Sequence, residues 1–205
     1  METVFKKEPG KNRKYPRAQW HDYNAGIFFV TVCTHNRAHC FGKISDNEIS
    51  HTKIGKYLCR CIEELGLHYP GISVDRYVVM PNHFHAIIII SPVGSRHAAA
   101  SITPVSNASS AISIIQNIGC LRPPHHPQGY DNFQERNHFN SLLSRAIGGL
   151  KSATTKQAHL QGLNFRWQSN FHDHIIRNQR DYNLISEYID TNIANWNKDK
   201  FFTKI

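Results

Sequence analysis

The sequence lacks the cysteine patterns that cross-link small proteins or hold structural zinc. It contains 5 cysteines, an odd number, and no two of them stand in Cys-x-x-Cys spacing. Disulfide frameworks use even sets of cysteines, and structural zinc sites use closely spaced pairs. The sequence therefore argues against both kinds of site, and the thiols are expected to stay reduced in a cytosol.

Long apolar runs are absent as well. No stretch of the chain approaches the roughly 18 consecutive apolar residues that cross a bilayer, and the N-terminus has no apolar signal-peptide core. We therefore expect a cytoplasmic protein without a membrane partner. A length of 205 residues suits one domain, with or without an insertion, that buries a core of its own.

Acidic residues are scarce relative to basic ones. The chain has 24 Lys and Arg against 15 Asp and Glu, which gives a formal net charge of +9. Such an excess favours an acidic partner, most simply nucleic acid. Residues 1–25 form a basic arm that includes Lys14 and Arg17. A solvated arm and an arm that contacts phosphates are both open interpretations of this segment.

Three apolar runs rich in β-branched residues predict strands. The run at 26–34 is nearly continuous, which is typical of a central, well-covered strand. The runs at 77–80 and 86–90 are separated by the turn signal Pro81-Asn82, so we expect them to form a hairpin.

A helix is predicted between the first strand and this hairpin. Residues 45–48 offer N-cap candidates ahead of an acidic first turn, and Gly66 supplies a stop signal. Apolar residues recur at helical spacing within this segment: Ile54, Leu58, Ile62 and Leu65.

The second half of the chain begins with a segment of different character. Residues 91–138 are rich in Ser, Ala, Asn, Pro and His, which predicts a low-complexity insertion. A helix is predicted over 139–157, although Gly148 and Gly149 inside it each cost about 1 kcal/mol relative to Ala. Close approach of another backbone and local bending of the helix explain the glycine pair equally well. A strand over 171–176 and a last helix that begins at about 178–181 complete the pattern.

This order of elements predicts an α+β fold. We expect a ferredoxin-like antiparallel sheet with helices on one face, plus a C-terminal helix that carries Tyr188. The predicted organisation is a basic arm at 1–25, one domain at 26–196 with the insertion at about 91–138, and a short tail at 197–205.

His83 and His85 are the first candidate site residues. They stand two apart at the start of the predicted strand 83–90, where side chains alternate between faces, so both imidazoles point the same way. Two imidazoles held by one rigid strand suit metal binding. Taken alone, a His-x-His pair is more often a pair of solvated histidines, and the motif by itself favours that interpretation.

Tyr188 and Asn192 lie on the last predicted helix. They are four residues apart, one helical turn, and so share a face. Spacing alone favours a packed aromatic residue for Tyr188 and a helix C-cap for Asn192. Tyr182 is a competing tyrosine, but it lies six residues earlier on a different face of the helix.

Four motifs occur together in the order found in a known family. They are 80–87 (Met-Pro-Asn-His-Phe-His-Ala-Ile), 149–152 (Gly-Leu-Lys-Ser), 167–177 (Trp-Gln-x-x-Phe-His-Asp-His-Ile-Ile-Arg) and 181–192 (Asp-Tyr-x-x-Ile-x-x-Tyr-Ile-x-x-Asn). Each motif is weak alone, but the ordered set is specific. It resembles the single-tyrosine HUH transposases, in particular their REP-associated (RAYT-like) branch.

The resemblance implies a role for each matching residue. His83 and His85 match the histidine pair that holds a divalent metal, Tyr188 matches the nucleophile, and Asn192 matches an amide that completes the metal site. The family uses Mg²⁺ or Mn²⁺, whereas two imidazoles and one amide favour Mn²⁺ on chemical grounds. His174 is a candidate helper for the tyrosine, with a structural hydrogen-bonding role as the favoured alternative.

The implied activity is that of a DNA transposase or nickase. It would cleave and rejoin single-stranded DNA near hairpins through a 5′-phosphotyrosine intermediate, in the cytoplasm and on the nucleoid when bound to DNA. A monomer and a homodimer are both open. The predicted phosphate contacts are Lys14, Arg17, Lys151 and Arg177. The alternative is a catalytically inactive, domesticated protein that binds hairpin DNA on the same fold.

The sequence departs from the family pattern in three places. Ile193 follows Asn192 where members usually have proline, the insertion is long, and the segment after Trp196 is short.

Two unrelated phosphate-handling families fit less well. Histidine-triad hydrolases need a third histidine where Ile87 stands, and two-histidine phosphoesterases need two separated His-x-Thr/Ser pairs.

Overall fold

The computed structural model describes residues 23–91 and 141–203. Lys14, Arg17 and nearly all of the insertion predicted at 91–138 lie outside the described residues. Within the described part of the chain, no helix is long and apolar enough to cross a membrane. The described cysteines, Cys33, Cys40, Cys59 and Cys61, are all free thiols.

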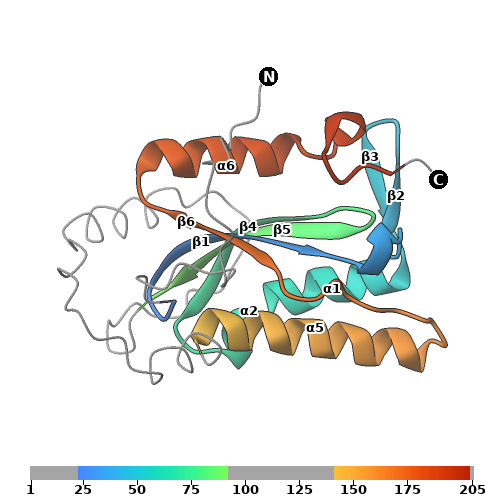
Figure 1. The fold of residues 1–205 in the computed structure, drawn as a ribbon, viewed down its shortest axis with the longest axis horizontal. Helices are drawn as coiled ribbons and strands as arrows, with labels where there is room; N and C mark the ends of the chain where they lie inside the picture. Colours follow the sequence, from blue (N-terminus) through green and yellow to red (C-terminus); the bar gives the residue numbers. More distant parts are fainter. Residues whose placement is uncertain (1–22, 92–140, 204–205) are drawn as a thin grey trace, which may run out of the picture.

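A four-stranded antiparallel sheet forms the centre of the molecule (Figure 1). Its strands are β1 (Gly26–Cys33), β4 (Ile72–Val79), β5 (His83–Ile90) and β6 (His172–Ile176), arranged in the order β4-β5-β1-β6. Every residue of β1 and β5 is buried. The near-continuous apolar runs of these two strands suit the central positions that they occupy, which confirms the strand predictions.

Two layers of helix cover the two faces of the sheet. α1 (Lys53–Glu63) and α5 (Leu142–Leu160) lie on one face, and α6 (Gln179–Thr191) lies on the other (Figure 1). A short helix, α2 (Leu65–His68), follows α1. The order strand, helix, two strands, helix, strand, with a further helix at the end, confirms the predicted α+β, ferredoxin-like fold.

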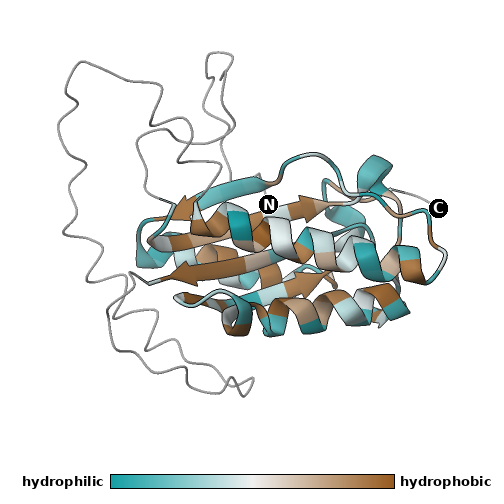
Figure 2. Cartoon of the chain, turned by 90° about the horizontal axis from the view of Figure 1, so that it is seen from below, coloured by the Kyte–Doolittle hydropathy of each residue, from teal (hydrophilic) through white to brown (hydrophobic). Residues whose placement is uncertain are grey.

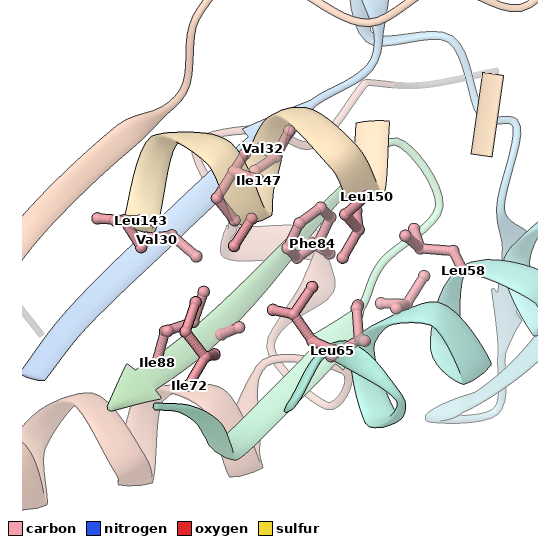
Figure 3. Packing of buried hydrophobic residues seen from close by; sticks show 14 of the residues in the cluster. Val30, Val32, Leu58, Leu65, Ile72, Phe84, Ile88, Leu143, Ile147 and Leu150 are labelled. Atoms are coloured by element: carbon pink, nitrogen blue, oxygen red, sulfur yellow. The ribbon is translucent and has the colours of Figure 1, made fainter. Parts of the chain in front are cut away.

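The alternation of side chains along β1 and β5 divides the core in two. Even-numbered residues such as Val30 and Phe84 pack with Leu58 of α1 and Ile147 of α5 (Figure 3). Odd-numbered residues face α6 instead: Ile27, Phe29, Ile87 and Ile89 pack with Ile185 and Ile189. In Figure 2 the strands are mostly hydrophobic, whereas the helices show hydrophobic and hydrophilic stretches side by side. The sheet therefore has two buried faces, and the odd-numbered face belongs to α6.

The predicted helix start at 45–48 is wrong. These residues form the turn of a hairpin between β2 (Gly42–Ser45) and β3 (Glu48–His51), with Asp46 and Asn47 at φ of 52° and 61°. Asp and Asn tolerate this left-handed conformation, which two-residue hairpin turns require. The same residue types serve as helix N-caps, so composition alone did not separate the two. The helix begins at Lys53, and Thr52 caps it by accepting a 3.1 Å hydrogen bond from the Gly55 amide.

The adjacent glycines of α5 have different surroundings. A methyl group on Gly149 would lie 2.0 Å from the hydroxyl of Tyr69, whereas one on Gly148 would meet nothing within 4 Å. Gly149 is thus needed for a close approach, but the group that approaches is a tyrosine side chain and not a backbone. α5 runs without interruption from Leu142 to Leu160.

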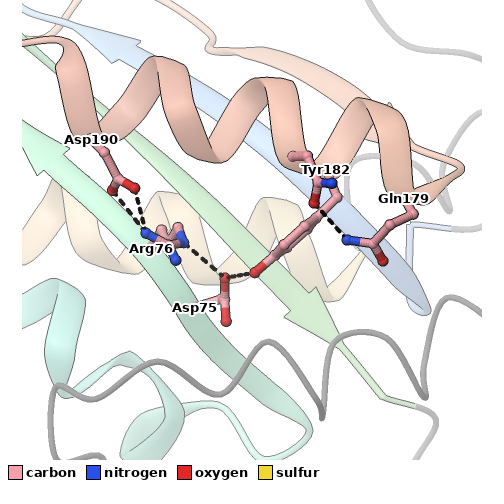
Figure 4. A network of polar contacts seen from close by, with 6 residues as sticks. Asp75, Arg76, Gln179, Tyr182 and Asp190 are labelled. Carbon is pink, nitrogen blue, oxygen red and sulfur yellow. Dashed lines mark hydrogen bonds and ion pairs between the residues drawn. The ribbon is translucent and has the colours of Figure 1, made fainter.

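Polar contacts fasten α6 to the edge strand β4 (Figure 4). The Arg76 guanidinium donates from Nη1 to both carboxylate oxygens of Asp190, at 2.9 and 2.6 Å. Near the other end of the helix, the Tyr182 hydroxyl donates to Asp75. Two anchors, at Tyr182 and Asp190 of the 13-residue helix, fix its direction across the sheet, and with it the position of Tyr188.

Candidate functional site

His83 and His85 begin β5 and project from the face that α6 covers. They pair across the sheet with Cys33 and Thr31 of β1. Both side chains are fully buried, with 0% of each residue exposed. Their Nε2 atoms lie 3.0 Å apart. Phe84, between them, packs on the opposite face in the core below the sheet, so strand alternation places the imidazoles together as expected.

Asn82 determines which nitrogen of His83 carries the proton. The amide nitrogen of Asn82 donates to the backbone oxygen of Phe201 at 2.9 Å, so its amide oxygen faces Nδ1 of His83, 2.7 Å away. An amide oxygen only accepts hydrogen bonds, and Nδ1 must therefore be the donor. In the neutral imidazole this leaves a lone pair on Nε2, which is the form that binds a metal ion.

Both imidazoles are held in the neutral form. Burial, followed by the charges of His85 and Arg37, lowers the pKa of His83 well below its ordinary value. Burial, helped by the charge of Lys200, lowers the pKa of His85 to about 3. Nδ1 of His85 lies 2.8 Å from the Thr31 hydroxyl, which fixes the orientation of this ring. The pair is therefore ready to act as ligands without losing protons first.

Tyr188 extends from α6 to this pair. Its hydroxyl lies 3.2 Å from Nε2 of His85 and 3.0 Å from Oδ2 of Asp199. Phe29 supports the arrangement by stacking on His85 and meeting the Tyr188 ring edge-on. Burial, followed by the negative charge of Asp199, raises the pKa of Tyr188 above its ordinary value. The phenol is therefore protonated in the structure and would have to lose that proton to act as a nucleophile.

Asn192 and Asp199 close the cluster on the C-terminal side. Asn192 directly follows α6, and its amide nitrogen donates to Oδ2 of Asp199 at 3.3 Å. The other carboxylate oxygen of Asp199 accepts from the backbone amide of Phe201 at 2.6 Å. Oδ1 of Asn192 is buried and has no hydrogen-bond partner among the described residues. An unpartnered buried acceptor of this kind suits a cation or a donor from a bound molecule.

The residues fit a divalent metal ion. Ligand atoms of His83, His85 and Asp199 all lie within 4.8 Å of one another. Two ligand atoms that each bond a metal at about 2.1 Å, at about 90° to one another, are separated by about 3 Å. The two histidine Nε2 atoms are 3.0 Å apart. The donor set of two imidazoles, a carboxylate and the free amide oxygen of Asn192 contains the nitrogen and oxygen ligands typical of first-row divalent ions.

Structure comparison finds two solved proteins with which most of this chain can be aligned. A REP-associated tyrosine transposase, whose structure was determined with a REP hairpin bound, aligns over 93% of this chain and 76% of its own length, with a TM-score of 0.48 and 20% identity. A transposase candidate from Deinococcus radiodurans aligns over 89% of this chain and 96% of its own, with a TM-score of 0.36 and 11% identity.

Sequence comparison finds a protein of unknown function. An uncharacterized protein of Haemophilus influenzae is 27% identical over 194 residues, which are 93% of this chain and 93% of that protein. No family model matches the chain.

Two of the predicted DNA contacts, Lys151 and Arg177, belong to the part of the chain that the structure describes. The ammonium group of Lys151 in α5 donates to the backbone oxygens of Gln168 and Asn170, at 2.9 and 3.1 Å. Lys151 thereby ties down the loop before β6, and it also lines a surface hollow of about 710 Å³ with Trp167. Arg177 is exposed directly after β6. Contact of either residue with DNA stays a prediction.

His174, the suggested helper of the tyrosine, lies on β6. It pairs across the sheet with Phe29, the residue whose ring contacts both His85 and Tyr188. Burial lowers the pKa of His174. Both the structural role and the direct role of His174 stay predictions.

Sequence reasoning missed Asp199 and the orienting role of Asn82. Asp199 lies in the segment 197–205, for which the sequence offered no pattern, yet it is the one acidic residue after Asp190. That isolation in a segment that follows Tyr188 and Asn192 was the available signal. Asn82 had a clear interpretation as a turn residue, and nothing in the sequence showed that its amide would bridge His83 and Phe201.

Proposed function

We propose that the chain is a single-tyrosine HUH transposase of the REP-associated kind. In this proposal it cleaves and rejoins single-stranded DNA near hairpins through a covalent 5′-phosphotyrosine. One observation carries the proposal: the Tyr188 hydroxyl lies 3.2 Å from Nε2 of His85, in a group that also contains the buried His83 and the half-buried Asp199. A nucleophile beside a set of metal ligands is the arrangement that such a reaction requires.

A divalent ion would be held by His83, His85 and Asp199, with Asn192 as a further ligand. Mn²⁺ suits the two imidazoles, and the oxygen donors also admit Mg²⁺. When bound, the ion supplies positive charge that polarises the scissile phosphate and stabilises the charge that builds on its oxygens.

The residues of the chain account for the covalent step itself. The phenolic oxygen of Tyr188 forms a bond to phosphorus while the bond between phosphorus and the 3′ oxygen of the preceding nucleotide breaks. The phenol proton leaves toward a neighbouring acceptor, and Oδ2 of Asp199, 3.0 Å away, already accepts its hydrogen bond. The leaving 3′ oxygen takes up a proton and becomes a free 3′ hydroxyl. The phosphodiester is conserved as a 5′-phosphotyrosine, so reversal rejoins the strand.

DNA as the partner is supported by charge and by the comparisons. The chain has a formal net charge of +9, which favours binding to phosphates. The similar REP-associated transposase was determined with a hairpin bound. We therefore propose hairpin-containing single-stranded DNA as the substrate, with contacts from Lys14, Arg17, Lys151 and Arg177 as the sequence predicted.

One observation favours the second candidate, a binding protein without catalytic activity. His83 and His85 are both 0% exposed, and the ring of Phe201 lies 4.6 Å from that of His83. A DNA phosphate reaches this pair only if the segment around Phe201 moves. A protein in which that segment stays in place would bind hairpin DNA without cleaving it.

The two candidates are separated by a covalent-adduct assay. The protein is incubated with single-stranded DNA that flanks its own gene, with Mn²⁺ or Mg²⁺, and resolved on a denaturing gel. The transposase predicts a metal-dependent protein–DNA adduct that Tyr188→Phe abolishes and that Tyr182→Phe retains. Tyr182 is the competing tyrosine on the same helix, and the Arg76–Asp190 contact still anchors α6 when the Tyr182 hydroxyl is removed. Hairpin binding without an adduct in the unmodified protein would instead support the second candidate.

A further inference from the structure

Arg37 lies on the loop after β1, beside Phe201, in an unfavourable backbone conformation. It ends the short 3-10 helix η1 (His35–Arg37), which follows β1, the strand whose Cys33 pairs with His83. Asn36 and Arg37 have φ values of 51° and 54°. The left-handed region is uncommon for a residue with a long side chain, and such outliers gather at functional sites.

The loop is held firmly in this conformation. The Thr34 hydroxyl lies within hydrogen-bonding distance of the Ala38 oxygen, at 2.8 Å, and of the Asn82 oxygen, at 2.9 Å. The His35 amide donates to the Arg166 oxygen at 2.9 Å. These contacts join the loop to the residues around the candidate metal ligands. The position of Arg37 is therefore set by its surroundings and not by its own backbone preference.

The guanidinium group of Arg37 lies over the ring of Phe201, which in turn contacts His83. It lies 4.5 Å from the centre of the Phe201 ring, and that ring lies 4.6 Å from the ring of His83. Nη1 of Arg37 is buried and has no hydrogen-bond partner among the described residues. No carboxylate of the described residues forms an ion pair with it. Buried guanidinium nitrogens are ordinarily paired, so an unpaired one marks a place for a missing acceptor.

Two unpartnered buried atoms of opposite kind thus lie on residues that contact the segment 199–201, Asn192 through Asp199 and Arg37 through Phe201. Oδ1 of Asn192 is an acceptor that suits a cation, and Nη1 of Arg37 is a donor that suits an anion. A phosphodiester beside a divalent ion supplies both. The planar guanidinium is the side chain best matched to phosphate oxygens. Lys200, the other cation against Phe201, is exposed and so is not confined to one direction.

We propose that Arg37 binds a non-bridging oxygen of the scissile phosphate and stabilises the charge that develops there during attack by Tyr188. This inference rests on the proposed function and adds a phosphate-binding residue that the four motifs of the sequence do not contain. Arg37 acts on the developing charge, so it is expected to matter more for the rate of cleavage than for the affinity of the DNA.

The first test compares three variants in single-turnover cleavage at saturating oligonucleotide. Arg37→Gln should slow adduct formation by at least about 100-fold without a matching loss of oligonucleotide affinity. Arg37→Lys keeps the positive charge but not the planar set of donors. Its rate of adduct formation should lie between those of Arg37→Gln and the unmodified protein. Arg60→Gln is the matched control, because Arg60 also lies over an aromatic ring, that of Tyr57, but on α1. Arg60→Gln should form the adduct at the rate of the unmodified protein.

A sulfur substitution separates phosphate binding from a structural role. Replacing a non-bridging oxygen of the scissile phosphate by sulfur should slow the unmodified protein but have little further effect on Arg37→Gln. The inference is overturned if Arg37→Gln cleaves as fast as the unmodified protein, or if sulfur slows both proteins equally.

A second measurement does not depend on cleavage. Tyr188→Phe protein, which keeps Arg37, is titrated with the single-stranded oligonucleotide while the arginine side-chain Nε–H signals are followed by NMR. The Arg37 signal should shift and that of Arg60 should not. An unchanged Arg37 signal in a protein whose unmodified form makes the adduct overturns the inference and leaves the proposed function intact. A shift in a protein that never forms the adduct supports the anion site and rejects the proposed function.

Discussion

The hydroxyl of Tyr188 lies 3.2 Å from Nε2 of His85, although the two residues are 103 positions apart in the chain. This contact joins the helix that covers one face of the sheet to a central strand of the sheet. It depends on the direction of α6, which Arg76 and Tyr182 fix through Asp190 and Asp75 (Figure 4). The candidate site is therefore a product of how α6 is anchored across the sheet.

Asp199 is expected to contribute to metal affinity. Asp199→Asn keeps the shape of the side chain but removes its negative charge from beside His83 and His85. Isothermal titration with Mn²⁺ should show a Kd raised at least about tenfold, a loss of about 1.4 kcal/mol. Glu187→Gln is a control on α6, where the carboxylate is exposed and does not belong to the cluster. Equal affinity of the Asp199 variant and the unmodified protein would leave only His83, His85 and Asn192 as ligands.

Stability of the metal-free protein should fall as the pH falls below about 6.5, the ordinary histidine value. Burial lowers the pKa of His85 to about 3 in the folded protein, and that of His83 falls as well. Between the folded and unfolded values the unfolded chain binds more protons, so acid favours unfolding. Above about pH 6.5 both states hold neutral imidazoles and these groups add no pH dependence.

Urea unfolding at a series of pH values measures this effect. The free energy of unfolding should decline from neutral toward acidic pH, and His85→Gln should make the decline shallower. His68→Gln is the control, because His68 is an exposed histidine at the end of α2. A decline of the same steepness in His85→Gln and in the unmodified protein would contradict the assignment of the pH dependence to the buried pair.

Adjacent glycines of α5 should respond oppositely to alanine. Gly148→Ala meets nothing within 4 Å, and the helix propensity of Ala should raise the free energy of unfolding by about 1 kcal/mol. Gly149→Ala places a methyl group 2.0 Å from the Tyr69 hydroxyl, so Tyr69 must leave its place against α5 and the gain is lost or reversed. Denaturant titration of the two variants gives both values. Equal stabilisation by both substitutions would show that Tyr69 moves freely.

Local patterns were enough to predict most of the fold. The apolar runs of β1 and β5 favour central strands because both of their faces need cover, and helical spacing marked α5 and α6. The start of α1 was misplaced because Asp46 and Asn47 suit a hairpin turn as well as a helix cap. That choice is made by the pairing of β2 with β3, two strands of four residues each that are too short to show a clear alternation.

The candidate site, like the fold, was predicted from the sequence only in part. The sequence by itself determined that His83 and His85 share a face, because strand residues alternate, and that Tyr188 and Asn192 share a face, because a helical turn separates them. Only the tertiary structure decided that the two faces meet. It also decided which residues join them: Asp199 and Arg37 come from a segment and a loop without a repeating pattern, and their places are set by long-range hydrogen bonds and ring contacts. Periodicity determines the direction of a side chain within its own element, whereas contact between elements depends on packing across the whole core.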